Sequence, residues 1–168
     1  MPLLLRKVTK PKWNHSLDLS WLRQGEMPAD PMTDLKTEDN KLSMWHVEDD
    51  ESNLDQVVTA IAATRDHLEN VDCVLLDQRD IVHLDINVGR TAGDTPLSEA
   101  NLWHCDMAHL SAQKLVELAG VMWERSRAER RLKKAVRQLL VSAVESGRID
   151  SSGLKETLRN EIAPSTVG

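Results

Sequence analysis

The most regular hydrophobic pattern of the chain runs from Arg125 to Val144. When each residue is advanced by about 100°, the rotation of an α-helix, apolar side chains gather on one side and basic side chains on the other. The apolar side comprises Leu132, Ala135, Val136, Leu139, Leu140 and Ala143, and the basic side comprises Arg127, Arg130, Arg131, Lys133, Lys134 and Arg137. Gly147 follows the run, where a left-handed helix end favours a residue without Cβ. We predict one basic amphipathic helix that ends near Gly147.

Residues 96–123 are also predicted to be helical, and the pattern leaves open a break near Ser111 or near Gly120. Thr95 and Pro96 have the character of an N-cap followed by a proline in the first turn. Apolar residues then recur at helical spacing and cover a wide arc: Ala100, Trp103, Met107, Leu110, Leu115, Leu118, Val121 and Met122. Such wide coverage is typical of a helix packed between other elements.

Short strands are predicted upstream of these helices. Residues 41–47 alternate imperfectly between apolar and polar side chains, residues 73–77 form a brief apolar run, and residues 82–88 alternate strictly. A helical stripe over residues 53–69 separates the first two strands. This succession predicts a β-α-β unit, in which the two strands are parallel and the crossover is right-handed.

The ends of the chain carry weaker patterns. Residues 3–9 are predicted to form an edge strand that ends before Pro11. Residues 10–40 are predicted to be irregular, and their apolar anchors to the core are Trp13, Trp21, Leu22 and Leu35. A last short helix is predicted through Leu154, Leu158 and Ile162.

Together these elements predict an α+β fold. A small sheet, consisting of one β-α-β unit plus a further strand, occupies the N-terminal half, and the C-terminal half is helical. Residues 1–95 form an acidic α+β part and residues 96–168 a helical part of one continuous domain. The length of 168 residues suits a single domain with a real core.

Charge is distributed unevenly along the chain. Residues 1–100 carry 10 Lys+Arg and 19 Asp+Glu, a net of −9, whereas the remainder carries 11 and 8, a net of +3, and the sum is the −6 of the whole chain. An acidic N-terminal part and a basic C-terminal part can neutralise each other within one chain, pair with a second copy, or face two different partners.

The sequence also bears on the compartment. The two cysteines do not make a disulfide scaffold, the first residues lack the apolar core of a signal peptide, and no run reaches the roughly 20 apolar residues of a membrane span. We therefore expect a reduced, cytoplasmic protein that does not enter a membrane.

Acidic residues follow two of the predicted strands. Asp49 and Asp50 come after the first, and Asp77 ends the second. If these strands are parallel neighbours, the carboxylates gather at the carboxyl edge of the sheet and could hold Mg²⁺ against a phosphate. The competing interpretation is that they form turns and stabilise helix N-termini.

The segment WHCDMAH (103–109) is a second candidate site. Cys105 and His109 are four residues apart and would share a face of the predicted helix, from which both could reach a metal ion. His104 lies within the apolar face, where a histidine is more often a hydrogen-bonded core residue. No Gly-rich phosphate loop or nucleophile elbow accompanies these residues.

The favoured hypothesis is a small protein-interaction module, an adaptor or regulatory subunit that docks on a protein partner or on itself through its helical half. Its binding residues would be the six basic residues Arg127, Arg130, Arg131, Lys133, Lys134 and Arg137. The first alternative is nucleic-acid binding through the basic helix 125–137, whose cations could neutralise phosphates. The second is Mg²⁺-dependent phosphoryl transfer or nuclease activity at the acidic strand ends. We expect no cofactor, and enzymatic activity is not favoured.

Overall fold

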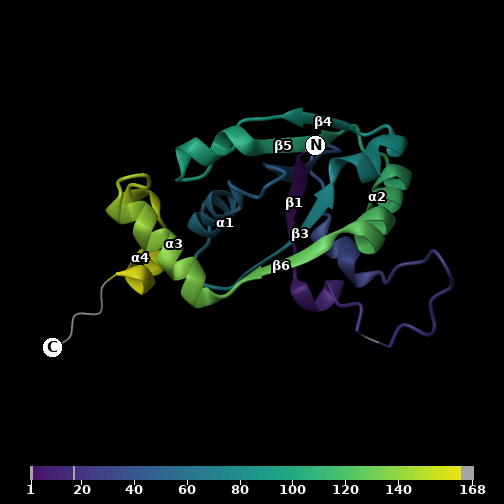
Figure 1. Cartoon of the computed structure of the whole chain (residues 1–168), viewed down its shortest axis with the longest axis horizontal. Helices are drawn as coiled ribbons and strands as arrows, with labels where there is room; N and C mark the ends of the chain where they lie inside the picture. Colours follow the sequence, from purple (N-terminus) through teal and green to yellow (C-terminus); the bar gives the residue numbers. More distant parts are fainter. Residues whose placement is uncertain (1, 17, 164–168) are drawn as a thin grey trace.

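The computed structural model describes residues 2–16 and 18–163. Its centre is a six-stranded antiparallel sheet with the strand order β4-β5-β2-β1-β3-β6 (Figure 1). The strands are β1 (Leu3–Lys7), β2 (Leu42–Val47), β3 (Val71–Asp77), β4 (Asn87–Arg90), β5 (His104–Ala108) and β6 (Arg127–Arg131).

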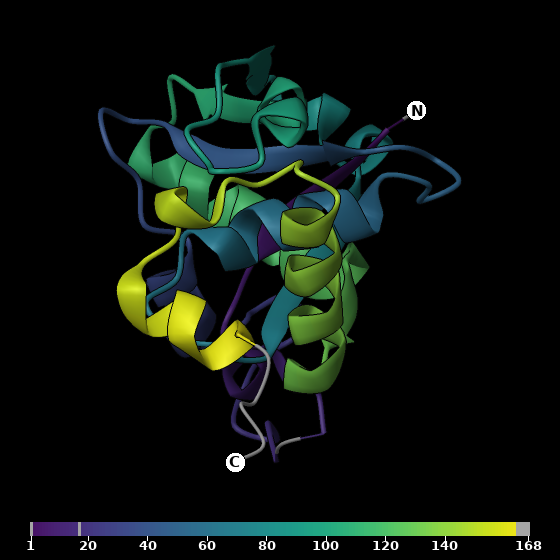
Figure 2. The ribbon, with the colours of Figure 1, turned by 90° about the vertical axis from the view of Figure 1, so that its left-hand side faces the viewer.

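Helices cover both faces of this sheet. The α-helices are α1 (Leu54–Ala63), α2 (Ala112–Arg125), α3 (Lys133–Glu145) and α4 (Glu156–Ile162). The 3₁₀ helices are η1 (Lys10–Trp13), η2 (Asp30–Asp34), η3 (Gln78–Leu84), η4 (Ser98–Trp103) and η5 (Ser151–Gly153). One face packs against α1, α3, α4 and η4, and the other against α2, η1 and η3. Figure 2 shows the first group from the end of the molecule where α3 and α4 lie.

Two hydrophobic cores result, one on each side of the sheet. In β1, Leu4 faces the α2 side and Leu5 the α1 side, and both are fully buried. Successive residues of a strand point to opposite faces, so a strand covered on both faces needs apolar residues in succession. The LLL of β1 and the CVLL of β3 meet that requirement.

The predicted small N-terminal sheet is wrong in its size and in its strand neighbours. β1, predicted at an edge, lies at the centre and pairs antiparallel with both β2 and β3. β2 and β3 therefore run in the same direction, as expected of strands joined through α1, but they are not neighbours. The chain remains α+β, with a sheet that also takes strands from the C-terminal half.

The helix predicted over residues 96–123 is wrong in its first half. Residues 104–108 form β5, whose Cys105 and Met107 are buried on the α2 side, while His104 and Asp106 point to the other face. Over five residues, an apolar residue at every second position fits a strand as well as part of a helical stripe. Pairing of β5 with β2 and β4 decides between them.

The helix predicted over residues 125–144 is divided into two elements. Ser126 caps the C-terminus of α2 in an extended conformation, residues 127–131 form β6, and α3 begins after Leu132. The segment RAERR has good helix formers. Its pairing with β3, however, gives its backbone groups hydrogen-bond partners and places Arg130 opposite Asp72. Tertiary context here overrides helix propensity. A continuous basic helix over residues 125–137 is therefore not formed.

Two further boundaries differ from the predictions. The strand predicted over residues 82–88 is replaced by η3, a left-handed residue at Asp85 (φ 49°) and the short β4. The helix predicted to reach residue 69 ends at Ala63, and Leu68 enters the core from the following loop. Trp21, predicted to anchor the core, is 67% exposed.

Several local predictions are confirmed. The strands at residues 42–47 and 71–77 and the last helix occur close to the expected places. Trp13 and Leu35 are buried anchors. Gly147 has a φ of +73° and follows α3, as a left-handed helix end requires.

We predict that both cysteines are unreactive in the folded protein. Cys73 and Cys105 lie on opposite faces of the sheet, and burial raises the pKa of each thiol to about 12. Because the thiolate is the reactive form, a thiol reagent such as Ellman's reagent should label neither residue in native buffer and both in denaturant. A Ser142→Cys variant, at an exposed position of α3, supplies a reactive control. Rapid labelling of a native cysteine would contradict the burial described.

Candidate functional site

The arginines of β6 are paired with acidic residues from the first half of the chain. The Arg127 guanidinium lies 2.6 Å from a carboxylate oxygen of Glu51 and 2.6 Å from one of Glu129. Arg131 contacts Asp55 at 3.1 Å and Glu129 at 3.2 Å. On the sheet face that carries these contacts, the basic strand is thus neutralised from the N-terminus of α1 and from within β6.

Arg130 points to the opposite face of β6 and is paired there. Its Nε and Nη2 donate to the two carboxylate oxygens of Asp72 at 2.7 and 3.1 Å. This bidentate geometry is the stronger form of an arginine–carboxylate pair. All three arginines of β6 therefore form ion pairs within one chain.

The other three predicted binding residues lie on α3. Lys133 donates its backbone N–H to Asn70 Oδ1 at 2.7 Å, and Lys134 is exposed. Arg137 donates to the carbonyl oxygens of Glu161, Ile162 and Ala163 at 3.4, 3.1 and 2.9 Å. The six basic residues thus lie on two elements and do not form a single continuous face.

The acidic strand ends lie at the same end of the sheet, but β1 separates them. Val47 and Asp77 are both register partners of Leu3, one from each side. Asp77 is held by the backbone and guanidinium of Arg79, whose hydrogen bonds lower the pKa of that carboxyl to about 2. In the part of the chain that the structure describes, no three His, Cys, Asp or Glu side chains come together in a way that could hold a metal ion.

A polar cleft of about 1050 Å³ opens beside the end of β2. Its lining includes His46, Glu48, Asp49, Asp50, Arg90 and Trp103. Burial, followed by the charge of Arg90, lowers the pKa of His46, and its Nδ1 is buried without a hydrogen-bond partner in the described structure. The cleft mixes both signs of charge and is widely open, so its geometry specifies no ligand.

The residues of segment 103–109 are separated by the strand geometry. Cys105 is fully buried in the α2-side core, whereas His109 is exposed after the end of β5 with a φ of 58°. His104 uses both ring nitrogens locally: Nε2 contacts Ser43 Oγ at 2.5 Å and Nδ1 contacts Thr91 Oγ1 at 2.8 Å. The two hydroxyls account for a polar ring at this half-buried position, and the cysteine and histidines do not form a metal site.

The helical part contains an apolar groove between α3 and α4, with a volume of about 420 Å³. Val141 and Val144 of α3 and Ile162 of α4 form its apolar surface. Arg137 and Arg159 also line it, from the first turns of α3 and from α4. An apolar floor with charged side chains around it is the usual composition of a protein-binding site.

The walls of this α3–α4 groove are tied to each other and to the body. Arg137 joins α3 to the last carbonyl groups of α4. Glu161 of α4 accepts the backbone N–H of Leu68 and lies 3.5 Å from His67 Nδ1, and these contacts lower the pKa of its carboxyl. The groove is therefore formed before any ligand binds.

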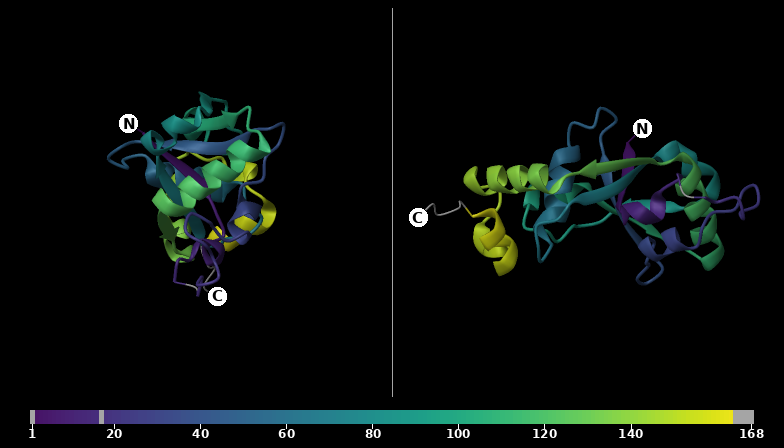
Figure 3. Two further views of the ribbon diagram at one scale, coloured as in Figure 1. Left: turned by 90° about the vertical axis from the view of Figure 1, so that its right-hand side faces the viewer. Right: turned by 90° about the horizontal axis from the view of Figure 1, so that it is seen from below.

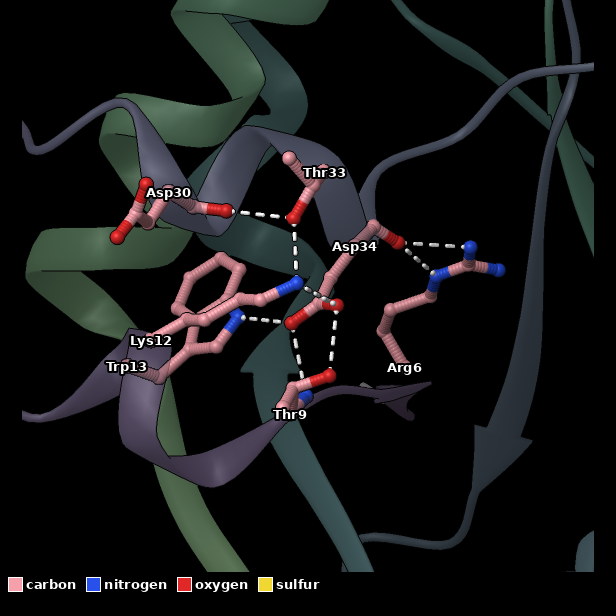
Figure 4. A network of polar contacts seen from close by, with 7 residues as sticks. All are labelled: Arg6, Thr9, Lys12, Trp13, Asp30, Thr33 and Asp34. Carbon is pink, nitrogen blue, oxygen red and sulfur yellow. Dashed lines mark hydrogen bonds and ion pairs between the residues drawn. The ribbon is translucent and has the colours of Figure 1, made fainter.

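A network of polar contacts lies at the other end of the molecule and joins η1 to η2 (Figure 4). Asp34 is its centre: its carboxylate accepts the backbone N–H of Thr9 at 2.7 Å and Trp13 Nε1 at 3.0 Å, and it lies 3.4 Å from Lys12 Nζ. Arg6 donates to the Asp34 carbonyl oxygen through Nε at 3.1 Å and Nη2 at 2.8 Å. This network clamps together the two 3₁₀ helices that flank residues 14–29.

Comparisons of the chain with protein-family models, with curated proteins and with solved structures found no match. Among the described residues, no helix is both long enough and apolar enough to cross a membrane.

The groove residues of α3 also follow a helical pattern in the sequence, but the stronger apolar stripe of the core-facing side makes that pattern easy to overlook. Arg137, Val141, Val144 and Glu145 recur at helical spacing on the side of α3 that carries the basic residues, away from the core face. Two valines on that side indicate a further apolar contact. Only the position of α4, which depends on long-range contacts, turns that side into a groove.

We predict that Asp34→Asn destabilises the protein, while Asp30→Asn on the same 3₁₀ helix does not. Burial raises the pKa of Asp34, but the hydrogen bonds from Thr9 and Trp13 and the charge of Lys12 outweigh it, so the pKa lies below its ordinary value. Loss of the charged acceptor should lower the free energy of unfolding by roughly 2–3 kcal/mol at neutral pH, the scale of hydrogen bonds to a charged group.

The dependence on pH follows from the lowered pKa. The stabilisation by Asp34 is fully present above its unfolded pKa of about 3.9 and is lost as the pH falls through the lower folded value. In urea titrations, the difference between wild type and Asp34→Asn should shrink below about pH 4. A difference that is absent at neutral pH, or constant with pH, would contradict the role of the clamp.

Proposed function

We propose that the protein is a protein-interaction module that binds an apolar side chain of its partner in the α3–α4 groove. The observation that carries the proposal is the groove itself, a preformed cavity of about 420 Å³ with an apolar floor and two arginines among its lining residues. Its volume falls within the roughly 300–1,000 Å³ of sites that enclose a small ligand or an anchoring side chain. The docking surface remains in the helical half, but it is the groove rather than a basic helix.

The distribution of charge supports an apolar contact over a phosphate contact. To reach a nucleic-acid backbone, Arg127, Arg130 and Arg131 would have to break their ion pairs with Glu51, Asp72 and Asp55, respectively. Breaking each pair would offset part of the free energy gained from a phosphate. Nucleic-acid binding therefore has weaker support than docking of a protein.

The ligand should combine an aromatic or branched apolar side chain with nearby carboxylates. Aromatic side chains bury a large area and dominate the energetics of interfaces. Arg137 and Arg159 against Glu145 give the groove lining a net charge of +1, which favours an acidic surrounding on the partner.

We predict that N-acetyl-tryptophanamide, a minimal probe for such a side chain, binds in the groove. In a ¹H–¹⁵N NMR titration, it should shift the amide signals of residues 141–145 and 159–163. Val144→Asp should weaken binding at least roughly tenfold, equivalent to about 1.4 kcal/mol, since it places a charge in the apolar floor.

Ser142→Asp is the matched control, because it places the same side chain on an exposed position of the same helix. It should leave the probe's affinity unchanged, and circular dichroism checks that both variants are folded. Shifts that lie elsewhere, or that Val144→Asp leaves intact, would refute the groove as the docking site.

A further inference from the structure

A tryptophan is presented to solvent on the segment clamped by η1 and η2. Trp21 is 67% exposed, as is Val82, whereas Trp13 and Trp123 are buried. Trp is among the residues most enriched at the energetic centres of interfaces, and loops carried on a rigid base commonly bear binding residues. The exposure of Trp21 leaves its indole available for a contact outside the monomer.

The backbone around Trp21 is fixed by successive turns. We call residues 18–27 the Trp21 segment. Asp18 Oδ1 accepts the N–H of Ser20 at 3.1 Å, and the carbonyl of Leu19 accepts the N–H of Leu22 at 2.9 Å. A further turn closes at Gly25, whose φ of +82° is the left-handed conformation that favours glycine. Ordered turns reduce the entropy that docking would cost.

The Trp21 segment and the α3–α4 groove lie at opposite ends of the long axis. Figure 1 shows α3 and α4 at the left and residues 18–27 at the right, and the view from below in Figure 3 separates them in the same way. Trp21 consequently cannot reach the groove of its own chain. A groove on a second copy carries no such restriction.

The two surfaces are complementary in chemistry. The groove offers the apolar side chains of Val141, Val144 and Ile162, and its lining has a net charge of +1. The Trp21 segment contains two acids and one base, Asp18, Glu26 and Arg23, a net charge of −1. The apolar groove lining with its net positive charge is therefore complementary to the exposed indole of Trp21 and the net negative charge of its segment.

We propose that Trp21 of one copy docks in the α3–α4 groove of a second copy, so that the chain assembles head to tail. This inference rests on the proposed function of the groove and names its occupant. Because the two contacting surfaces are different, each copy that uses its tryptophan still offers its groove. Such a heterologous contact propagates into an open chain, or closes into a ring, instead of stopping at a dimer.

The test combines two variants that block opposite ends. Trp21→Ala removes the docking side chain and leaves the α3–α4 groove intact. Val144→Asp blocks the groove and leaves Trp21 in place. In sedimentation velocity, the wild type should show a sedimentation coefficient that rises with concentration, and each variant alone should remain monomeric. An equimolar mixture of the two should give a 1:1 dimer and no larger species, because only one productive contact is possible.

Val82→Ala is the control, since it truncates an apolar residue of equal exposure and should assemble as the wild type does. Wild-type assembly by Trp21→Ala, or a mixture that stays monomeric, would overturn the proposal. If the mixture stays monomeric while N-acetyl-tryptophanamide still binds the groove and Val144→Asp abolishes that binding, the groove serves a different partner. If the amide does not bind the groove, the proposed function itself fails.

Discussion

The backbone pairing of β1 on both of its sides is the constraint on which the rest of the structure depends. β1 joins β2 to β3, so the sheet is continuous only because this strand lies between them. Leu4 and Leu5 then require an apolar layer on each face. The helices needed for those layers come mainly from the second half of the chain, and so do β5 and β6, which extend the sheet at either side. The two halves of the sequence are therefore interleaved in one sheet.

That interleaving also determines what is left at the surface. The acidic first half meets the basic second half along β3 and β6 and at the start of α1, where Asp72 and Asp55 pair with Arg130 and Arg131. An acidic and a basic half could neutralise each other, pair with a second copy or face different partners, and these ion pairs neutralise charge within the monomer. Besides the polar cleft beside β2, two apolar features remain at the surface: the α3–α4 groove at one end of the molecule and the exposed Trp21 at the other.

The local elements that the sequence predicted best are those whose pattern is long or whose turn chemistry is specific. The buried strand predicted at residues 73–77 and found at Val71–Asp77, the core face of α3 and the left-handed Gly147 belong to this group. β5 and β6 could not be predicted in the same way, because five residues fit a strand and a helix equally well. Their conformation is decided by partners far away in the sequence, β2 for one and β3 for the other.

The candidate site was harder to predict than the fold, for a related physical reason. Most of the basic residues that stood out in the sequence are engaged in contacts within the monomer, as the pairing of Arg127 with Glu51 illustrates. The valines of the groove and the exposure of Trp21 depend on how helices and loops pack, which composition does not encode. A sequence pattern shows which side chains are available, and tertiary structure decides which of them remain free to bind.

Small-angle X-ray scattering of the wild-type protein over a series of concentrations tests the central claim most directly, because it reports both mass and shape. If complementary surfaces lie at opposite ends of the long axis, the forward scattering per unit mass and the maximum dimension should rise with concentration while the radius of the cross-section stays constant. Forward scattering that remains that of a monomer throughout, or growth equally in length and cross-section, would contradict the account.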